Sequence, residues 1–236
     1  MIVTIHQPEH LPWLGFFNKM AKADVYVILD SVQFEKNYFQ NRNKIIGSNG
    51  VQWLGIPVQM KGHMGGTIAD TLIVNDLRWR TKYLNTVRMS YSKHPYFDEV
   101  YPVLEQCINL DTQSISAINI AIFKAFADKM DIKPQFISSS ELNASGLKSN
   151  LILEICKELN ASMYIAGPSG RDYLDVESFK EAGIEVTYND FAHPTYPQKK
   201  TDEFIPYMSS WDLFMNCGFE EGKKIIMLGN ENLACE

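Results

Sequence analysis

Apolar runs and polar turns alternate along the chain in the way that is typical of α/β proteins. Residues 1–5 form a short, β-branched apolar run that predicts a buried strand, and the polar residues 6–10 end it. Pro12 fits the first turn of a helix that extends to Met20, and a second apolar strand is predicted over 25–29. Strand, helix and strand in this order predict a right-handed βαβ unit of a parallel sheet.

The rest of the chain continues this alternation. Strands are predicted over 52–58, 67–74, 133–138, 163–166 and 184–188. Helices are predicted over 77–90 with Asp76 as N-cap, up to 107, and over 112–130, 149–159, 176–182 and 209–217, the last with Gly218 at C′. The pattern predicts an α/β fold with a Rossmann-like, doubly wound, mainly parallel sheet. We expect one α/β domain over 1–236, in which 76–130 is a mainly helical insertion and 196–236 a C-terminal helical tail.

Composition narrows the function classes. The hydrophobic fraction of 45% and the charged fraction of 21% are those of an ordinary globular protein. A net charge of −6 gives no support to a nucleic-acid partner, and no apolar run approaches the length of a membrane span, so we expect no membrane insertion. The 4 cysteines include no Cys-x-x-Cys pair, which indicates reduced thiols and a cytoplasmic location.

The first candidate chemistry follows the first two predicted strands. Ligands of parallel sheets bind at the carboxyl ends of strands, where His6 to His10 and Asp30 are expected to lie. We predict catalytic roles for His6, His10 and Asp30, and substrate contacts for Gln7 and Glu9. The start of the helix after His10 should also keep that imidazole neutral.

A polar segment with interleaved aromatic and cationic residues comes next, over 31–44. It is either a solvated loop or a substrate loop, in which aromatic faces hold a ring and cations hold phosphates. Its position just after the second strand favours the substrate loop. The predicted contacts there are Gln33, Lys36, Asn37, Tyr38, Asn41 and Arg42.

A glycine-containing turn over 167–173 follows the strand predicted over 163–166. It is either a ligand-binding turn or a tight connection in which Asp172 caps the next helix, and its position at a strand end favours the ligand. Farther on, Asp212 and Asn216 share a helix face and either reach the site or pair with each other. The substrate contacts predicted in these two segments are Gly167, Ser169, Arg171, Asp172, Tyr173, Asp212 and Asn216.

Four segments taken together, in this order along the chain, resemble the WbqC-like family: residues 6–15, 32–42, 166–175 and 211–218. The resemblance covers nearly the whole chain. Because that family is associated with lipopolysaccharide and O-antigen gene neighbourhoods, it implies work on activated sugars. More distantly, residues 7–13 resemble the first βα unit of HxGH-type nucleotidyltransferases, with His10 at the first histidine and Trp13 in place of the second. That likeness implies nucleotide binding without nucleotidyl transfer.

We therefore expect a transferase that modifies a nucleotide-linked amino sugar in surface-polysaccharide biosynthesis. An acyl or aminoacyl group would pass to the sugar amine from a nucleotide, acyl or aminoacyl donor, with His6 or His10 as general base and Lys36, Arg42 and Arg171 on the phosphates. The alternatives are a non-catalytic nucleotide-sugar binding protein and a diverged nucleotidyltransferase-like enzyme. No metal is predicted, because Pro8 breaks any helical spacing between His6 and His10.

Overall fold

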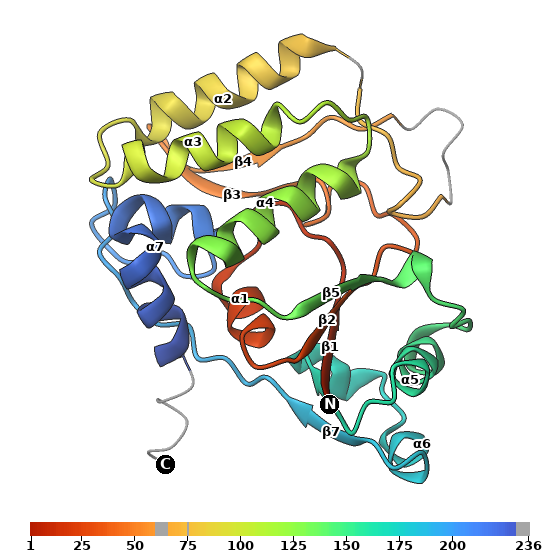
Figure 1. Ribbon diagram of the computed structural model, residues 1–236. Helices are drawn as coiled ribbons and strands as arrows, with labels where there is room; N and C mark the ends of the chain where they lie inside the picture. Colours follow the sequence, from red (N-terminus) through yellow and green to blue (C-terminus); the bar gives the residue numbers. More distant parts are fainter. Residues whose placement is uncertain (60–65, 75, 230–236) are drawn as a thin grey trace.

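Five parallel strands form the central sheet of the computed structural model, which describes residues 1–59, 66–74 and 76–229 (Figure 1). The strands lie in the order β5-β2-β1-β6-β7. The predicted mainly parallel α/β sheet is confirmed. Its strands are β1 (Ile2–His6), β2 (Val25–Ile28), β5 (Gln135–Ser138), β6 (Met163–Ala166) and β7 (Glu185–Tyr188).

The strand order reverses direction between β1 and β6. From β1 the chain moves outward through β2 to β5, and it then returns to the other side of β1 for β6 and β7. Strands β1 and β6 are joined by backbone hydrogen bonds and by Thr4, whose hydroxyl donates to the carbonyl oxygen of Ile165 at 2.8 Å. A crevice at the carboxyl ends of such a strand pair is where doubly wound folds bind ligands.

Helices cover both faces of the sheet. Helix α1 (Leu14–Met20) and helix α4 (Ile115–Lys129) cover one face, and the ring of Phe123 on α4 lies 5.9 Å from that of Tyr26 on β2. Helices α5 (Lys148–Glu158) and α6 (Val176–Glu181) pack on the other face. The alternation of apolar strands and amphipathic helices in the sequence accounts for this layering.

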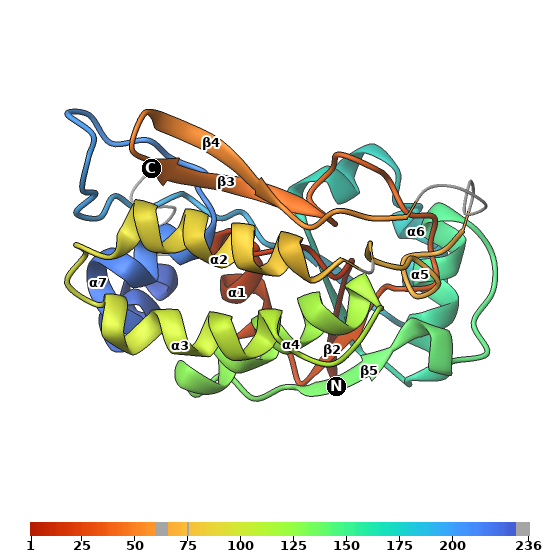
Figure 2. The ribbon, with the colours of Figure 1, turned by 90° about the horizontal axis from the view of Figure 1, so that it is seen from above.

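The chain between β2 and β5 contains a hairpin as well as helices. Strands β3 (Arg42–Gly47) and β4 (Gly50–Gly55) pair antiparallel in a sheet of their own, beside α2 (Leu77–Tyr91) and α3 (Phe97–Ile108) (Figure 2). The strand expected over 52–58 is therefore not part of the main sheet. The prediction of a strand over 67–74 is also wrong, since that segment forms only isolated β-bridges, such as the one between Gln33 and Thr67.

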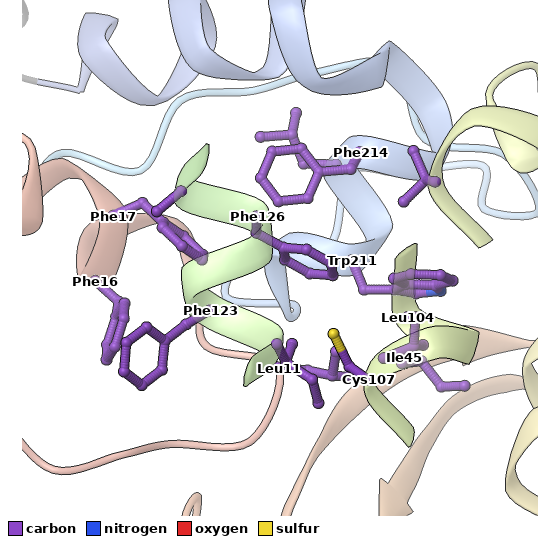
Figure 3. Packing of buried hydrophobic residues seen from close by; sticks show 14 of the residues in the cluster. Leu11, Phe16, Phe17, Ile45, Leu104, Cys107, Phe123, Phe126, Trp211 and Phe214 are labelled. Carbon is purple, nitrogen blue, oxygen red and sulfur yellow. The ribbon is translucent and has the colours of Figure 1, made fainter. Parts of the chain in front are cut away.

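Aromatic side chains fill the larger core, on the α1 side of the sheet (Figure 3). The Phe126 ring lies 5.4 Å from Phe214 and 6.2 Å from Trp211, both on α7 (Ser210–Leu228). Gly218 has φ 74°, which fits the predicted C′ position, but the helix resumes beyond it. A Cβ at Gly218 would lie 2.7 Å from the Tyr96 ring, so this kink requires glycine for space as well as conformation.

Candidate active site

A cavity of about 400 Å³ lies where the strand order reverses. His6 and Glu9, which follow β1, line one part of it, and residues 167–169, which follow β6, line another. Both segments leave the carboxyl ends of neighbouring parallel strands, as expected for a ligand site of this fold. The other lining residues are Trp13, Gly15, Phe16, Lys19, Tyr38, Phe39, Asn43, Asn189 and Tyr207.

Helix α1 brings both an aromatic wall and a cation to the cavity. Trp13 is the N-cap residue of the helix, and Phe16 and Lys19 follow at a spacing that places them on one face. Gly15 allows the Trp13 ring to lie against the helix, because a Cβ there would lie 2.3 Å from Trp13 Cη2. The predicted helix thus exists, but it begins at Leu14 and not at Pro12.

Three ionisable side chains form a hydrogen-bonded series along the cavity. Lys19 Nζ lies 3.0 Å from His6 Nδ1, and His6 Nε2 lies 3.0 Å from Glu9 Oε1. Lys19 also donates to the carbonyl oxygen of Ile5 at 3.0 Å. These contacts leave one of the three ammonium protons of Lys19 without an assigned acceptor, and Glu9 Oε2 is buried with no hydrogen-bond partner in the described chain.

Burial sets the protonation of this series. Lys19 is only 3% exposed, and burial lowers the pKa of its ammonium group to about 8. The pKa of His6 is lowered first by burial and then by the charge of Lys19, against the opposing effect of Glu9. The ring is therefore neutral at pH 7. Because Lys19 donates to Nδ1, the proton of the neutral ring lies on Nε2 and is donated to Glu9.

Five of the residues predicted from the sequence line this cavity: His6, Glu9, Tyr38, Gly167 and Ser169. They come from the ends of β1 and β6 and from the loop after β2. The remaining predicted residues lie outside the cavity lining.

His10 is fully buried and does not line the cavity. Its Nδ1 lies 3.0 Å from Asn119 Oδ1 and its Nε2 lies 2.8 Å from the Tyr83 hydroxyl, so both nitrogens are engaged. Burial lowers the pKa of His10 to about 4. The ring is thus neutral as expected, but because of burial and not because of the helix dipole, since α1 begins only at Leu14. The chain turns at Leu11, which has φ 43°, between His10 and the start of α1.

Asp30 is also buried away from the cavity, at 5% exposure. Its carboxylate accepts hydrogen bonds from the hydroxyl of Ser139 at 3.1 Å and from the backbone N–H and the hydroxyl of Ser140, each at 3.0 Å. These bonds join the carboxyl end of β2 to that of β5. They satisfy the carboxylate within the protein and give Asp30 a role in holding the sheet edge.

The cations predicted to hold phosphates do not line the cavity. Arg171 forms a bidentate pair with Asp190, at 2.8 and 2.7 Å, and packs over the Tyr188 ring. The Arg42 guanidinium lies 4.2 Å from the centre of the Trp53 ring, and Lys36 is exposed. Among the described lining residues, Lys19 is the one lysine or arginine.

The other predicted contacts of the loop after β2 are made within that loop or with its neighbours. Gln7 accepts from Gln40 Nε2 at 2.8 Å, and the backbone N–H of Asn37 donates to Asn41 Oδ1 at 3.0 Å. These bonds shape the segment that carries Tyr38 into the cavity. Gln33, Asp172 and Tyr173 are exposed outside the lining.

Asp212 and Asn216 on α7 fix the segment that leads to Tyr207. Asp212 accepts from the hydroxyls of Tyr91 and Tyr196 and from Gln198 Nε2, each at 3.0 Å, and burial raises the pKa of its carboxyl group. Asn216 Oδ1 accepts from the backbone N–H of residue 199 at 3.1 Å, and its Nδ2 donates to the Asp212 carbonyl oxygen. Neither residue lines the cavity, and both hold the chain around residues 196–199 in place.

Sequence reasoning missed Lys19, which lies on a helix that is otherwise read as a packing element. The available signal was a cation within an apolar helical run that is followed directly by a strand, because a charge on a buried face requires a partner. Tyr207 and Asn189 carried no such signal. They come from the connection between β7 and α7, which is held by contacts far apart in sequence, such as the bond from the Ser209 backbone N–H to the Lys44 carbonyl oxygen.

The family of the chain follows from comparison with known sequences. The WbqC-like protein family matches residues 7–224. The chain belongs to this family. Its sequence is 31% identical over 220 residues to the uncharacterized protein Rv1507c of Mycobacterium tuberculosis, covering 92% of this chain and 94% of that protein. No solved structure matches the chain significantly. These comparisons do not show a relationship to nucleotidyltransferases, and His10, which carries that likeness, is buried outside the cavity.

Among the described residues, no helix combines the length and apolar character that crossing a membrane requires. Within the same residues, no three His, Cys, Asp or Glu side chains are grouped as metal ligands would be.

Proposed function

We propose that this protein is a transferase that adds an acyl or aminoacyl group to the amine of a nucleotide-linked amino sugar, in the cytoplasmic synthesis of a surface polysaccharide. The observation that carries the proposal is the His6–Glu9 pair in a cavity at the carboxyl ends of β1 and β6. An amine nucleophile must lose a proton during acyl transfer, and a neutral imidazole oriented by a carboxylate is suited to accept it.

The tautomer of His6 defines where that proton would go. Nε2–H is donated to Glu9, so the lone pair of Nδ1 is the basic position, and Lys19 donates to it. In the proposed reaction the substrate amine replaces Lys19 as the donor to Nδ1. The amine nitrogen then bonds to the acyl carbon, its proton passes to Nδ1, and the donor's leaving group departs with the bond electrons.

Aromatic side chains support the choice of a sugar ring as substrate. Trp13, Phe39 and Tyr207 line the cavity, and the rings of Trp13 and Tyr207 lie 6.1 Å apart. Such faces pack against the C–H groups of a sugar. The amide of Asn43 is engaged by the backbone of His10, Leu11 and Lys44, and Asn189 Oδ1 accepts from Lys22 Nζ, so the sugar contacts are proposed from the rings.

The phosphates of a nucleotide would extend out of the cavity mouth. Lys36, Arg42 and Arg171 lie within two residues in sequence of the lining residues Tyr38, Asn43 and Ser169, respectively. A ligand that reaches Arg171 would have to compete with Asp190 for the guanidinium. The phosphate contacts are therefore proposed as secondary to the ring and amine contacts.

A non-catalytic sugar-binding protein is the second candidate. It is favoured by one observation, that both nitrogens of His6 are engaged within the protein.

The experiment that separates the transferase from the binding protein begins with a thermal-shift panel of nucleotides, nucleotide sugars and amino sugars. A ligand at 100 times its Kd stabilises the fold by about 2.7 kcal/mol.

Stabilising ligands from this panel are then incubated with acyl and aminoacyl donors, and the products are analysed by mass spectrometry. Transfer to the sugar amine supports the enzyme. Binding without transfer from any donor supports the second candidate, and no stabilisation by any amino sugar or nucleotide sugar contradicts both.

A further inference from the structure

Lys19, His6 and Glu9 have the arrangement of a nucleophile, a base and a group that orients the base. In activated nucleophiles of this kind the nucleophile lies within hydrogen-bond reach of an imidazole, whose other nitrogen bonds to a carboxylate. Here the two contacts are 3.0 Å each, and all three side chains line one cavity. We infer that Lys19 is a nucleophilic amine that forms an imine with the carbonyl carbon of a sugar-sized aldehyde or ketone bound in this cavity.

The surroundings of Lys19 differ from those of the surface lysines. Its ammonium group contacts two neutral acceptors, Ile5 O and His6 Nδ1, and none of the ion pairs in the described part of the chain includes it. Lysines 133, 157, 180 and 224 each pair with a carboxylate. The charge of Glu9 raises the pKa of Lys19, but burial has the larger, opposite effect and favours the neutral form, which is the form that attacks a carbonyl.

The protonation of Lys19 agrees with this geometry. Burial lowers its pKa to about 8, so a substantial fraction of the amine is neutral near physiological pH. Below its pKa, each unit of lowering raises the neutral fraction of an amine about tenfold. An exposed lysine of ordinary pKa therefore has a far smaller neutral fraction at pH 7.5.

The proposed step balances within the three residues and the ligand. The neutral Nζ bonds to the carbonyl carbon, one Nζ proton passes to His6 Nδ1, and the protonated ring gives that proton to the former carbonyl oxygen, which becomes a hydroxyl. The second Nζ proton then passes to Nδ1 and on to that hydroxyl, which leaves as water as the C=N bond forms. Nothing is oxidised or reduced, and Glu9 stabilises the transient imidazolium ring through Nε2–H.

This inference uses the cavity of the proposed function but does not require acyl transfer. Trapping of a carbonyl compound on Lys19 without any transfer activity would support the imine alone. Transfer activity without trapping would contradict the imine and leave the proposed function standing.

The experiment uses the full chain, glycolaldehyde as the probe, and sodium cyanoborohydride to reduce any imine to a stable secondary amine. Peptide mapping by mass spectrometry then measures the modified fraction at each lysine over time. Lys19 is expected to react at least about tenfold faster than the exposed Lys36 and Lys82, with a rate that rises with pH up to about 8. Equal rates at all three lysines would overturn the inference.

Variants test the role of the series and need no activity assay. His6→Asn should slow the labelling of Lys19 but not of Lys82, while Lys82→Arg, the control, should leave the rate at Lys19 unchanged. Lys19→Arg keeps a cation and should abolish the fast-reacting site. If Lys19 reacts as fast in His6→Asn as in the unaltered chain, the triad-like assignment is wrong. Should a variant fail to fold, the comparison of lysines within the unaltered chain still decides the question.

Discussion

Lys19 Nζ and His6 Nδ1 lie 3.0 Å apart and join helix α1 to the end of strand β1. The lysine is the donor in this contact at neutral pH, so it fixes the tautomer of the histidine and occupies its basic nitrogen. The positive charge of Lys19 lowers the pKa of His6, and both are buried where two positive charges would be costly.

The first prediction follows from this pair. Lys19→Met removes the ammonium group beside the ring, and the pKa of His6 should rise because one of the two causes that lower it is lost. NMR titration of the imidazole signals in the unaltered chain and in the variant measures the shift. His193, on the connection between β7 and α7, serves as an internal reference whose titration should stay the same. A His6 pKa that is unchanged or lower in Lys19→Met would contradict the contact.

A second prediction concerns His10, which the structure places in the core and not in the cavity. His10→Asn should reduce the free energy of unfolding by about 1–3 kcal/mol, since Asn119 and Tyr83 lose part of a buried network. Urea denaturation measures the loss, and ligand affinity of the folded variant should be nearly unchanged. Normal stability together with lost turnover would instead return His10 to a catalytic role.

The burial of His10 also predicts how the free energy of unfolding depends on pH. Its pKa is about 4 in the folded chain and about 6.5 when unfolded, so the unfolded chain binds the extra proton between these values. Stability should therefore fall as pH drops from 6.5 to 4, by about 3 kcal/mol from this residue. Urea midpoints across this range should change less in His10→Asn than in the unaltered chain. Parallel curves for the two proteins would mean that His10 is not buried in its neutral form.

Gly15 offers a test of the aromatic wall. Gly15→Ala places a methyl group where the Trp13 ring lies, because the nearest ring atom is 2.3 Å from the added Cβ. Displacement of the ring should weaken ligand binding by about tenfold, equivalent to about 1.4 kcal/mol, and titration calorimetry measures it. Glu181→Ala, at an exposed position on α6 outside the cavity lining, is the control. Equal effects of the two variants would count against a binding role for Trp13.

The sequence predicts those elements best whose structure depends on neighbouring residues, and it predicts least well those that depend on contacts between distant residues. The β1–α1–β2 unit follows from apolar runs and polar ends, and Asp76 caps α2 as predicted by accepting from the Arg78 backbone N–H. The β3–β4 hairpin was missed although Asn49-Gly50, with φ 96° at the glycine, is a hairpin turn signal. The pattern predicts one strand there, over 52–58, and assigns residues 42–44 at the start of β3 to the polar loop.

The choice between His6 and His10 could not be made from the sequence. Both follow the same strand, and the residue that turns His10 inward, Leu11, adopts a positive φ that its own type does not suggest. The partners of His10 are Tyr83 and Asn119, far along the chain on α2 and α4. Lys19 was missed for the related reason that its acceptors, Ile5 and His6, become its neighbours only when α1 packs on β1.

The most direct test of the proposed active site is the separation of turnover from affinity in His6→Asn, using a sugar ligand found by the thermal-shift panel and its acyl or aminoacyl donor. We expect kcat to fall by about 10²–10⁴-fold while the Kd of the sugar changes little, because asparagine keeps a hydrogen-bonding group but cannot accept a proton at neutral pH. Unchanged kcat in a folded His6→Asn variant would contradict the assignment of His6 as the base.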